Sequence, residues 1–146
     1  MLIRAATVAD IPAMMALSRE APSAAQWAQQ QYENAVGSRD RVALVVAKNS
    51  VLEAFLVARV LDLEWEIENI VVAGERRRRG LALRLLVEVT NLARLQKAQA
   101  IFLEVRESNH AARSLYEKNG FIQIGRRPHY YHEPDEDALV YRRAIN

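Results

Sequence analysis

Three polar residues in the last third of the chain have types and spacing that suit acid–base chemistry. Glu104 lies in an alternating apolar run at 100–106, on the face opposite Leu103. Asn109 and Tyr116 are seven residues apart, which is two turns of a helix, so they share nearly one helix face. A carboxylate and a phenol that meet at one cleft can act as general base and general acid. The same pattern also fits a half-exposed strand glutamate and a core tyrosine, and both interpretations stay open from the spacing alone.

A second group is the turn of four arginines at 76–79, followed by Gly80. The β-branched run at 70–72 predicts a strand end before this turn, and 81–97 predicts a helix after it. A strand, a turn and a helix in this order present unpaired backbone N–H groups to a phosphate, and glycine lets the anion approach. Arginines at a helix N-terminus are unfavourable without an anion. The turn therefore favours a phosphate ligand over a solvated corner, although a nucleic-acid-binding module would use the same arginines.

Two further groups could contact a substrate. The polar stretch at 128–137 is predicted to be a loop, and Tyr130 and Tyr131 within it are interpreted as a wall that orders a peptide or an amine. In the alternating run at 64–72, Glu66 and Glu68 point to one side and form another candidate for proton transfer. A solvated strand face is the alternative for these two glutamates. The two histidines of the loop are too loosely placed for a metal site, and we expect no metal.

These side chains need a scaffold, and the periodicity predicts one. The order of elements is β-α-α-β-β-β-α-β-α-β-β. The strands are expected at 1–6, 42–47, 52–60, 64–72, 100–106, 121–127 and 138–143, and the helices at 8–20, 24–36, 81–97 and 109–118. Such a string packs as an α/β protein, with a mixed central sheet of about seven strands and helices on both faces.

Composition excludes several classes of protein. A chain of 146 residues with 51% hydrophobic and 26% charged residues is typical of one globular domain, and we expect a single domain over 1–146. The net charge of +2 indicates no general affinity for nucleic acid. There is no apolar run of the roughly 18 residues that cross a bilayer and no secretory leader, so no membrane partner is expected. The absence of cysteine is compatible with a reducing, cytoplasmic location.

The combination of motifs resembles a known family. The element order, Arg77-x-x-Gly80-x-Ala82 and the distal Leu115-Tyr116 pair are similar to the GNAT superfamily of acetyl-CoA-dependent acyltransferases. Within it, Phe-Leu-Glu-Val-Arg-Glu-Ser-Asn at 102–109 and Arg-Pro-His-Tyr-Tyr at 127–131, followed by Glu-Asp-Ala at 136–138, resemble the RimI family. These bacterial enzymes acetylate the N-terminal alanine of a ribosomal protein.

The resemblance implies a GNAT fold with a mostly antiparallel sheet, and acetyl-CoA as cosubstrate. It makes Glu104 the proton acceptor and Tyr116 the proton donor to the departing thiolate. The backbone of 70–72 would hold the acetyl and pantetheine groups, and the turn before the helix would hold the diphosphate. The residues expected to contact acetyl-CoA are Ile70, Val71, Val72, Arg77, Arg78, Arg79, Gly80, Leu81, Ala82, Leu83 and Asn109.

The acceptor that the resemblance implies is the N-terminal amine of a protein, with a ribosomal protein and an N-terminal alanine as the expected choice. The residues expected to bind it are Trp27, Glu66, Glu68, Tyr130 and Tyr131. The segment at 21–27 does not reproduce the Pro-Trp-Ser pattern of the RimI family, so a small-molecule amine or a lysine side chain remains an alternative acceptor. A GNAT-fold protein that binds acetyl-CoA without catalysis is disfavoured, because both Glu104 and Tyr116 are present.

Overall fold

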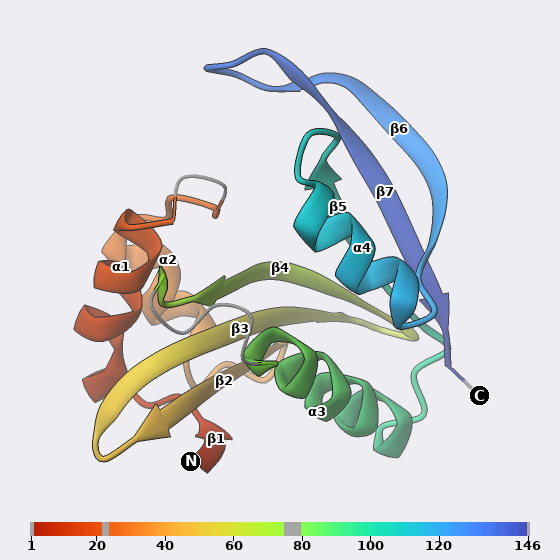
Figure 1. Ribbon diagram of the computed structural model, residues 1–146. Coiled ribbons are helices and arrows are strands. Elements are labelled where there is room, and N and C mark those ends of the chain that lie inside the picture. Colours follow the sequence, from red (N-terminus) through yellow and green to blue (C-terminus); the bar gives the residue numbers. More distant parts are fainter. Residues whose placement is uncertain (1, 22–23, 75–79, 146) are drawn as a thin grey trace.

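A seven-stranded mixed sheet organises the computed structural model, which describes residues 2–21, 24–74 and 80–145 (Figure 1). The strand order is β1-β2-β3-β4-β5-β7-β6, and only β4 and β5 run parallel. The strands are β1 (Leu2–Ala5), β2 (Arg41–Lys48), β3 (Val51–Leu61), β4 (Glu64–Val72), β5 (Ala100–Arg106), β6 (Ile122–Tyr131) and β7 (Glu136–Ala144). The helices are α1 (Ile11–Arg19), α2 (Gln29–Ala35), α3 (Leu81–Leu95) and α4 (His110–Lys118), with a 3-10 turn, η1 (Val8–Asp10), before α1. The predicted α/β fold and its mostly antiparallel sheet are confirmed.

Helices cover both faces of the sheet because strand β3 is apolar on both. Its alternate residues Phe55 and Val57 pack into a core with α1 and α2. Leu56, between them, packs into the other core with α3 and α4. A strand that is buried on both faces is typical of the centre of an α/β sheet. The two cores fix α1 and α2 on one side of the sheet and α3 and α4 on the other.

A β-bulge interrupts β4 in the middle of the sheet. Val57 of β3 pairs with Asn69, but the next residue of β3, Ala58, pairs with Ile67, so Glu68 has no residue opposite it. An extra residue reverses which face the following side chains point to. Accordingly, Ile67 is buried in the α3/α4 core, whereas Val71 is buried in the α1/α2 core. The simple alternation predicted for the whole run at 64–72 is therefore wrong beyond Ile67.

Strands β4 and β5 separate directly beside the bulge. Their parallel pairing extends over four residue pairs, from Glu64 with Ala100 to Ile67 with Leu103, and then stops. Figure 1 shows the two strands diverging from that point. Beyond Ile67, the edge of β4 that faces β5 has no strand partner among the described residues, so its main-chain N–H and C=O groups are available to a ligand. The sheet thus contains a gap at its centre.

Two segments differ from the predicted elements. Helix α2 begins at Gln29 instead of 24, because the Gln26 side chain donates hydrogen bonds to the carbonyls of Ser18, Ala21 and Ala24 and holds the segment at 24–28 outside the helix. The stretch at 128–137 is mostly strand instead of loop, since β6 continues to Tyr131 and β7 starts at Glu136. Strand β6 lies at the sheet edge, where a proline is tolerated. The tyrosine wall therefore stands on a hairpin.

An ion pair ties the first strand to the first helix and sets a pH dependence of stability. Asp10 accepts hydrogen bonds from Arg4 at 2.7 and 2.9 Å and from the Thr7 N–H at 2.7 Å. The Arg4 contact lowers the pKa of Asp10 to about 2 from its ordinary 3.8. Because the folded pKa lies below the unfolded one, the stabilisation is complete above pH ~4 and is lost as the pH falls toward 2.

We expect Asp10→Asn to lower the free energy of unfolding at pH 7 by about 1–2 kcal/mol, a value reduced because solvent reaches the exposed Arg4. Urea unfolding of both proteins from pH 7 to pH 2 should show this gap closing at the acid end. Asp40→Asn is the control, since Asp40 pairs with Arg41 at an exposed site. A gap that persists unchanged at pH 2 would show that the carboxylate charge is not its source.

Candidate active site

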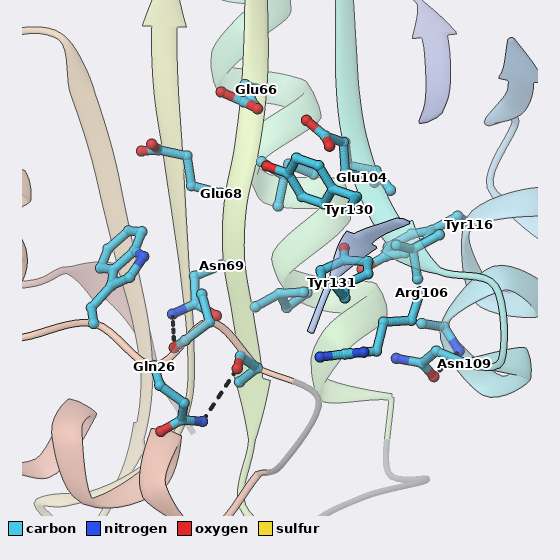
Figure 2. Close-up of a pocket in the computed structure, with 18 of the residues that line it drawn as sticks. Gln26, Glu66, Glu68, Asn69, Glu104, Arg106, Asn109, Tyr116, Tyr130 and Tyr131 are labelled. Atoms are coloured by element: carbon cyan, nitrogen blue, oxygen red, sulfur yellow. Dashed lines mark hydrogen bonds between the residues drawn. The ribbon is translucent and has the colours of Figure 1, made fainter. Parts of the chain in front are cut away.

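The gap between β4 and β5 is a cleft of about 750 Å³ that is open to solvent. Its walls come from four parts of the chain: the segment at 24–27, the bulged part of β4, the end of β5 with α4, and the end of the β6–β7 hairpin. The predicted residues that line it are Trp27, Glu66, Glu68, Ile70, Glu104, Asn109, Tyr116, Tyr130 and Tyr131. Residues from segments more than a hundred positions apart thus meet in one cavity (Figure 2).

Two carboxylates face each other at one end of the cleft, Glu66 from β4 and Glu104 from β5 (Figure 2). Burial, followed by the charges of Glu68 and Glu104, raises the pKa of Glu66 above its ordinary value. One oxygen of Glu104, Oε2, is buried and has no hydrogen-bond partner among the described residues, and the nearest cation is Arg127 Nε at 3.7 Å. A buried oxygen with unused acceptor capacity is ready to take a proton or bind an ammonium group.

Glu68, the bulged residue, differs from these two carboxylates. Its Oε1 forms an ion pair with Arg41 Nε at 2.7 Å, and both side chains are about four-fifths buried. An arginine at this distance occupies the carboxylate oxygen and competes with an acceptor amine for it. Glu66 and Glu68 thus line the same cleft, as the sequence predicted, but the Glu68 carboxylate is engaged by Arg41.

Tyr116 lies on the α4 side of the cleft and is only 5% exposed. Burial, with a smaller contribution from Tyr131, raises the pKa of its hydroxyl above its ordinary value. The phenol is therefore protonated at neutral pH and can donate a proton or a hydrogen bond. Its ring packs against Phe121 and Tyr141 in the α3/α4 core. That packing holds the side chain in one position.

Tyr130 and Tyr131 form the wall on the hairpin side. Their rings meet edge to face, with centroids 5.1 Å apart. Burial raises the pKa of Tyr131 to about 12, and the charge of Glu104 raises that of Tyr130. The Arg106 guanidinium lies over the Tyr131 ring, 4.2 Å from its centre. Sequence reasoning did not single out Arg106, although the alternation of β5 placed it on the same face as Glu104.

The opposite wall is the segment at 24–27, which precedes α2. Trp27 packs edge to face against the buried Tyr32, with ring centroids 5.3 Å apart. The carbonyl of Ala25 accepts from Ser18 Oγ at 3.0 Å and from Asn69 Nδ2 at 3.4 Å. Asn69 follows the bulge and is buried, so it joins this wall to β4. No pattern in the sequence had marked Asn69, since only the bulge turns it toward the wall.

The side of the sheet that carries α3 and α4 offers a separate place for an anion. Gly80 adopts the left-handed conformation (φ 77°) before α3, and a Cβ at this position would meet nothing within 4 Å. No side chain of the described residues caps α3, and the N–H groups of Leu81, Ala82 and Leu83 have no partner within the helix itself. Arg77, Arg78 and Arg79 lie outside the described residues.

The other four residues expected to contact a coenzyme lie in three different places. Asn109 lines the cleft and caps α4, its Oδ1 accepting from the Ala112 N–H at 3.2 Å. Ile70 also lines the cleft, whereas the Val71 side chain is buried in the α1/α2 core, which leaves only its backbone for a ligand. Val72 packs against the α3/α4 core.

In the part of the chain that the structure describes, no helix is long and apolar enough to cross a membrane.

Comparison with known proteins gives consistent matches. The acetyltransferase (GNAT) family model matches residues 11–121. The ribosomal protein bS18-alanine N-acetyltransferase of Escherichia coli K12 is 30% identical over 139 residues, which are 94% of this chain and 93% of that protein. The crystal structure of the Escherichia coli ribosomal-protein-S18-alanine N-acetyltransferase matches 99% of this chain and 94% of its own, with a TM-score of 0.89 and 27% identity. An aminoglycoside 6'-N-acetyltransferase in complex with coenzyme A shares the fold, with a TM-score of 0.84 at 17% identity over 100% of this chain and 98% of its own.

Proposed function

The chain belongs to the GNAT family of acetyltransferases, and we propose that it transfers an acetyl group from acetyl-CoA to the N-terminal amine of a protein. The observation that carries this proposal is the pair of carboxylates, Glu66 and Glu104, at the end of a cleft that is open to solvent and walled by aromatic rings. Carboxylates attract an ammonium group, and aromatic side chains suit the first residues of a peptide.

The residues present fit acetyl-CoA in two respects. The free edge of β4 beyond Ile67 offers main-chain groups to an extended pantetheine chain. The uncapped start of α3 behind Gly80 offers N–H groups and a favourable dipole to the diphosphate. Both features lie toward the α3/α4 side, while Trp27 belongs to the α1/α2 side. We propose that acetyl-CoA and the acceptor approach from opposite faces of the sheet and meet in the gap.

The proposed chemistry is direct attack of the amine on the thioester. The α-amine of a peptide has a pKa of about 7.7–8.0 and must lose a proton before it attacks. In this proposal Glu104 takes that proton, because it lines the cleft and its buried Oε2 has no hydrogen-bond partner among the described residues. Tyr116 gives a proton to the departing thiolate, since burial keeps it protonated. A backbone N–H on the free edge of β4 stabilises the oxyanion.

We propose a ribosomal protein with an N-terminal alanine as the acceptor, since the Escherichia coli relative is named for that reaction. The test is acetyl-CoA turnover with peptides that differ in their first residue, including a peptide that begins with alanine. Free amines, and a peptide with a blocked N-terminus and one lysine, are assayed beside them. Turnover that requires a free N-terminus supports the proposal. Turnover confined to free amines or lysine side chains would refute it and would leave the family assignment intact.

The anion site predicts a large and specific effect of a negative charge at Gly80. We expect Gly80→Asp to raise the Kd for acetyl-CoA at least about tenfold, because the carboxylate repels the diphosphate at the helix N-terminus. Gly37→Asp is a matched control: Gly37 is also exposed, has φ 78°, and a Cβ there would likewise meet nothing within 4 Å. Both variants carry the same backbone strain. Isothermal titration should show unchanged affinity for Gly37→Asp, and equal losses in both variants would contradict the assignment.

A further inference from the structure

The Glu-Asp pair at the start of β7 has no role in the chemistry proposed above. Glu136 does not line the cleft, yet its side chain is only 14% exposed and makes two polar contacts. Its Oε2 accepts from the backbone N–H of Ser108 at 2.6 Å, and its Oε1 accepts from Arg106 Nη1 at 3.3 Å. These contacts lower the pKa of Glu136, so it is charged at neutral pH. A charged acceptor with two donors makes stronger bonds than a neutral one.

Through these contacts Glu136 connects the two sides of the cleft. On one side, the Arg106 guanidinium lies over the ring of Tyr131, and its Nη1 also donates to the Pro134 carbonyl at 3.4 Å. Tyr131 is the register partner of Glu136 across the hairpin. On the other side, Ser108 precedes Asn109, the N-cap of α4. One carboxylate thus holds the tyrosine wall against the start of the helix that carries Tyr116.

We propose that Glu136 is a positioning residue: by orienting Arg106 on Tyr131 and binding the Ser108 N–H, it fixes the distance between the acceptor wall and α4. This inference rests on the proposed function, because it concerns how the acceptor peptide is held there. A wall that moves away from α4 grips the peptide less well but leaves the anion site at α3 unchanged. The role therefore belongs to acceptor binding and not to binding of acetyl-CoA.

A neighbouring cluster provides the control. Asp137 accepts from Arg126 at 2.7 Å, and Arg126 also bonds Glu107 at 2.6 Å. This second link joins the same hairpin to the same connection between β5 and α4. Its members are more exposed than Glu136, and their ion pairs involve neither Tyr130 nor Tyr131. Asp137 Oδ1 also accepts from the His129 N–H at 3.0 Å, next to the wall. Asp137→Asn keeps an amide oxygen that can accept this bond, so it removes the charge alone.

The experiment compares Glu136→Gln, Asp137→Asn and wild type in steady-state kinetics with an alanine-first peptide. For Glu136→Gln we expect the KM for the peptide to rise about tenfold, with kcat and the KM for acetyl-CoA changing less than about threefold, the pattern for loss of a binding contact. Arg106→Lys keeps the charge but loses the flat stacking surface, and it should raise the peptide KM in the same way. Asp137→Asn should leave the peptide KM within about twofold.

Two results would overturn the inference: a peptide KM in Glu136→Gln equal to that of the wild type, or an equal rise in Asp137→Asn. A lower Tm with unchanged kinetic constants would likewise assign Glu136 a structural role alone. If Glu136→Gln does not fold, Arg106→Lys decides by the same criterion. Failure of the proposed function has a different signature, since the wild type itself would then not acetylate the N-terminus of any peptide.

Discussion

Replacing Tyr116 with phenylalanine should lower kcat by one or more orders of magnitude while leaving the Kd for acetyl-CoA within about twofold, because general acid catalysis contributes roughly 10²–10⁴-fold. The substitution removes one oxygen from a ring that is fixed by Phe121 and Tyr141. The remaining ring keeps these contacts, so the cleft retains its shape. What is lost is the proton donor that burial keeps protonated.

The measurement is steady-state turnover of the best peptide, with coenzyme A affinity determined separately. Tyr141→Phe is the control, since Tyr141 is also buried, and its hydroxyl bonds Glu117 and Arg113 outside the cleft. It should lower Tm and change kcat by less than about threefold. Wild-type turnover in Tyr116→Phe would remove Tyr116 from the mechanism. A rate that recovers with a thioester whose thiol is more acidic would support the proton-donor role, since a better leaving group needs less protonation.

The second large effect is expected for Glu104→Gln, which should reduce turnover and move the pH optimum upward. Without a base, only the fraction of acceptor that is already neutral reacts, and this fraction grows as the pH passes the amine pKa of about 7.7–8.0. The Glu104 charge is also one of the causes that raise the pKa of Glu66. Removing the Glu104 charge lowers the pKa of Glu66. If Glu66 causes a fall in rate at acid pH, that part of the pH–rate profile therefore shifts to lower pH.

Two companion variants separate the three carboxylates. Glu68→Gln should have a smaller effect on the pH profile, because the Glu68 carboxylate is already engaged in its ion pair with Arg41. Glu66→Gln shows which of Glu66 and Glu104 is the general base. If the pH–rate profile of Glu104→Gln matches that of the wild type while Glu66→Gln shifts, Glu66 is the base, and the role proposed for Glu104 is wrong.

The sequence predicted the elements better than their ends. The β5 range at 100–106 was correct, and the helix expected at 109–118 was correct to within one residue, because alternation and helical spacing are local patterns. The predicted start of α2 was wrong because a contact outside the helix competes with helix formation there. The Gln26 side chain donates to three carbonyls, one in α1 and two in the segment that follows it. The prediction of a loop at 128–131, where the structure has a strand, was wrong for a similar reason. A proline in a polar stretch predicts a loop. Because β6 lies at the edge of the sheet, its strand tolerates the proline.

The site depended even more on features that sequence patterns do not contain. Helical spacing placed Asn109 and Tyr116 together correctly, and both line the cleft. The bulge at Glu68 could not be predicted, because one extra residue in a ladder depends on the register of β3 against β4. That bulge brings the buried Asn69 to the segment at 24–27, where its Nδ2 donates to the Ala25 carbonyl. Long-range pairings of this kind also explain why the sequence predicted no site role for Arg106 and Glu136.

The short junction between β4 and β5 has a consequence for the whole sheet. Because only four residue pairs join the strands, the sheet consists of two sub-sheets, β1–β4 and β5–β7–β6, that share one narrow seam. The Glu64–Arg142 ion pair and the bond from Gln99 N–H to the Leu63 carbonyl reinforce only its closed end. A ligand that bonds the free edge of β4 therefore supplies the backbone partners that a neighbouring strand would otherwise provide. In the proposed complex acetyl-CoA would complete the sheet, and its binding would stabilise the fold by an amount that grows with its concentration relative to Kd.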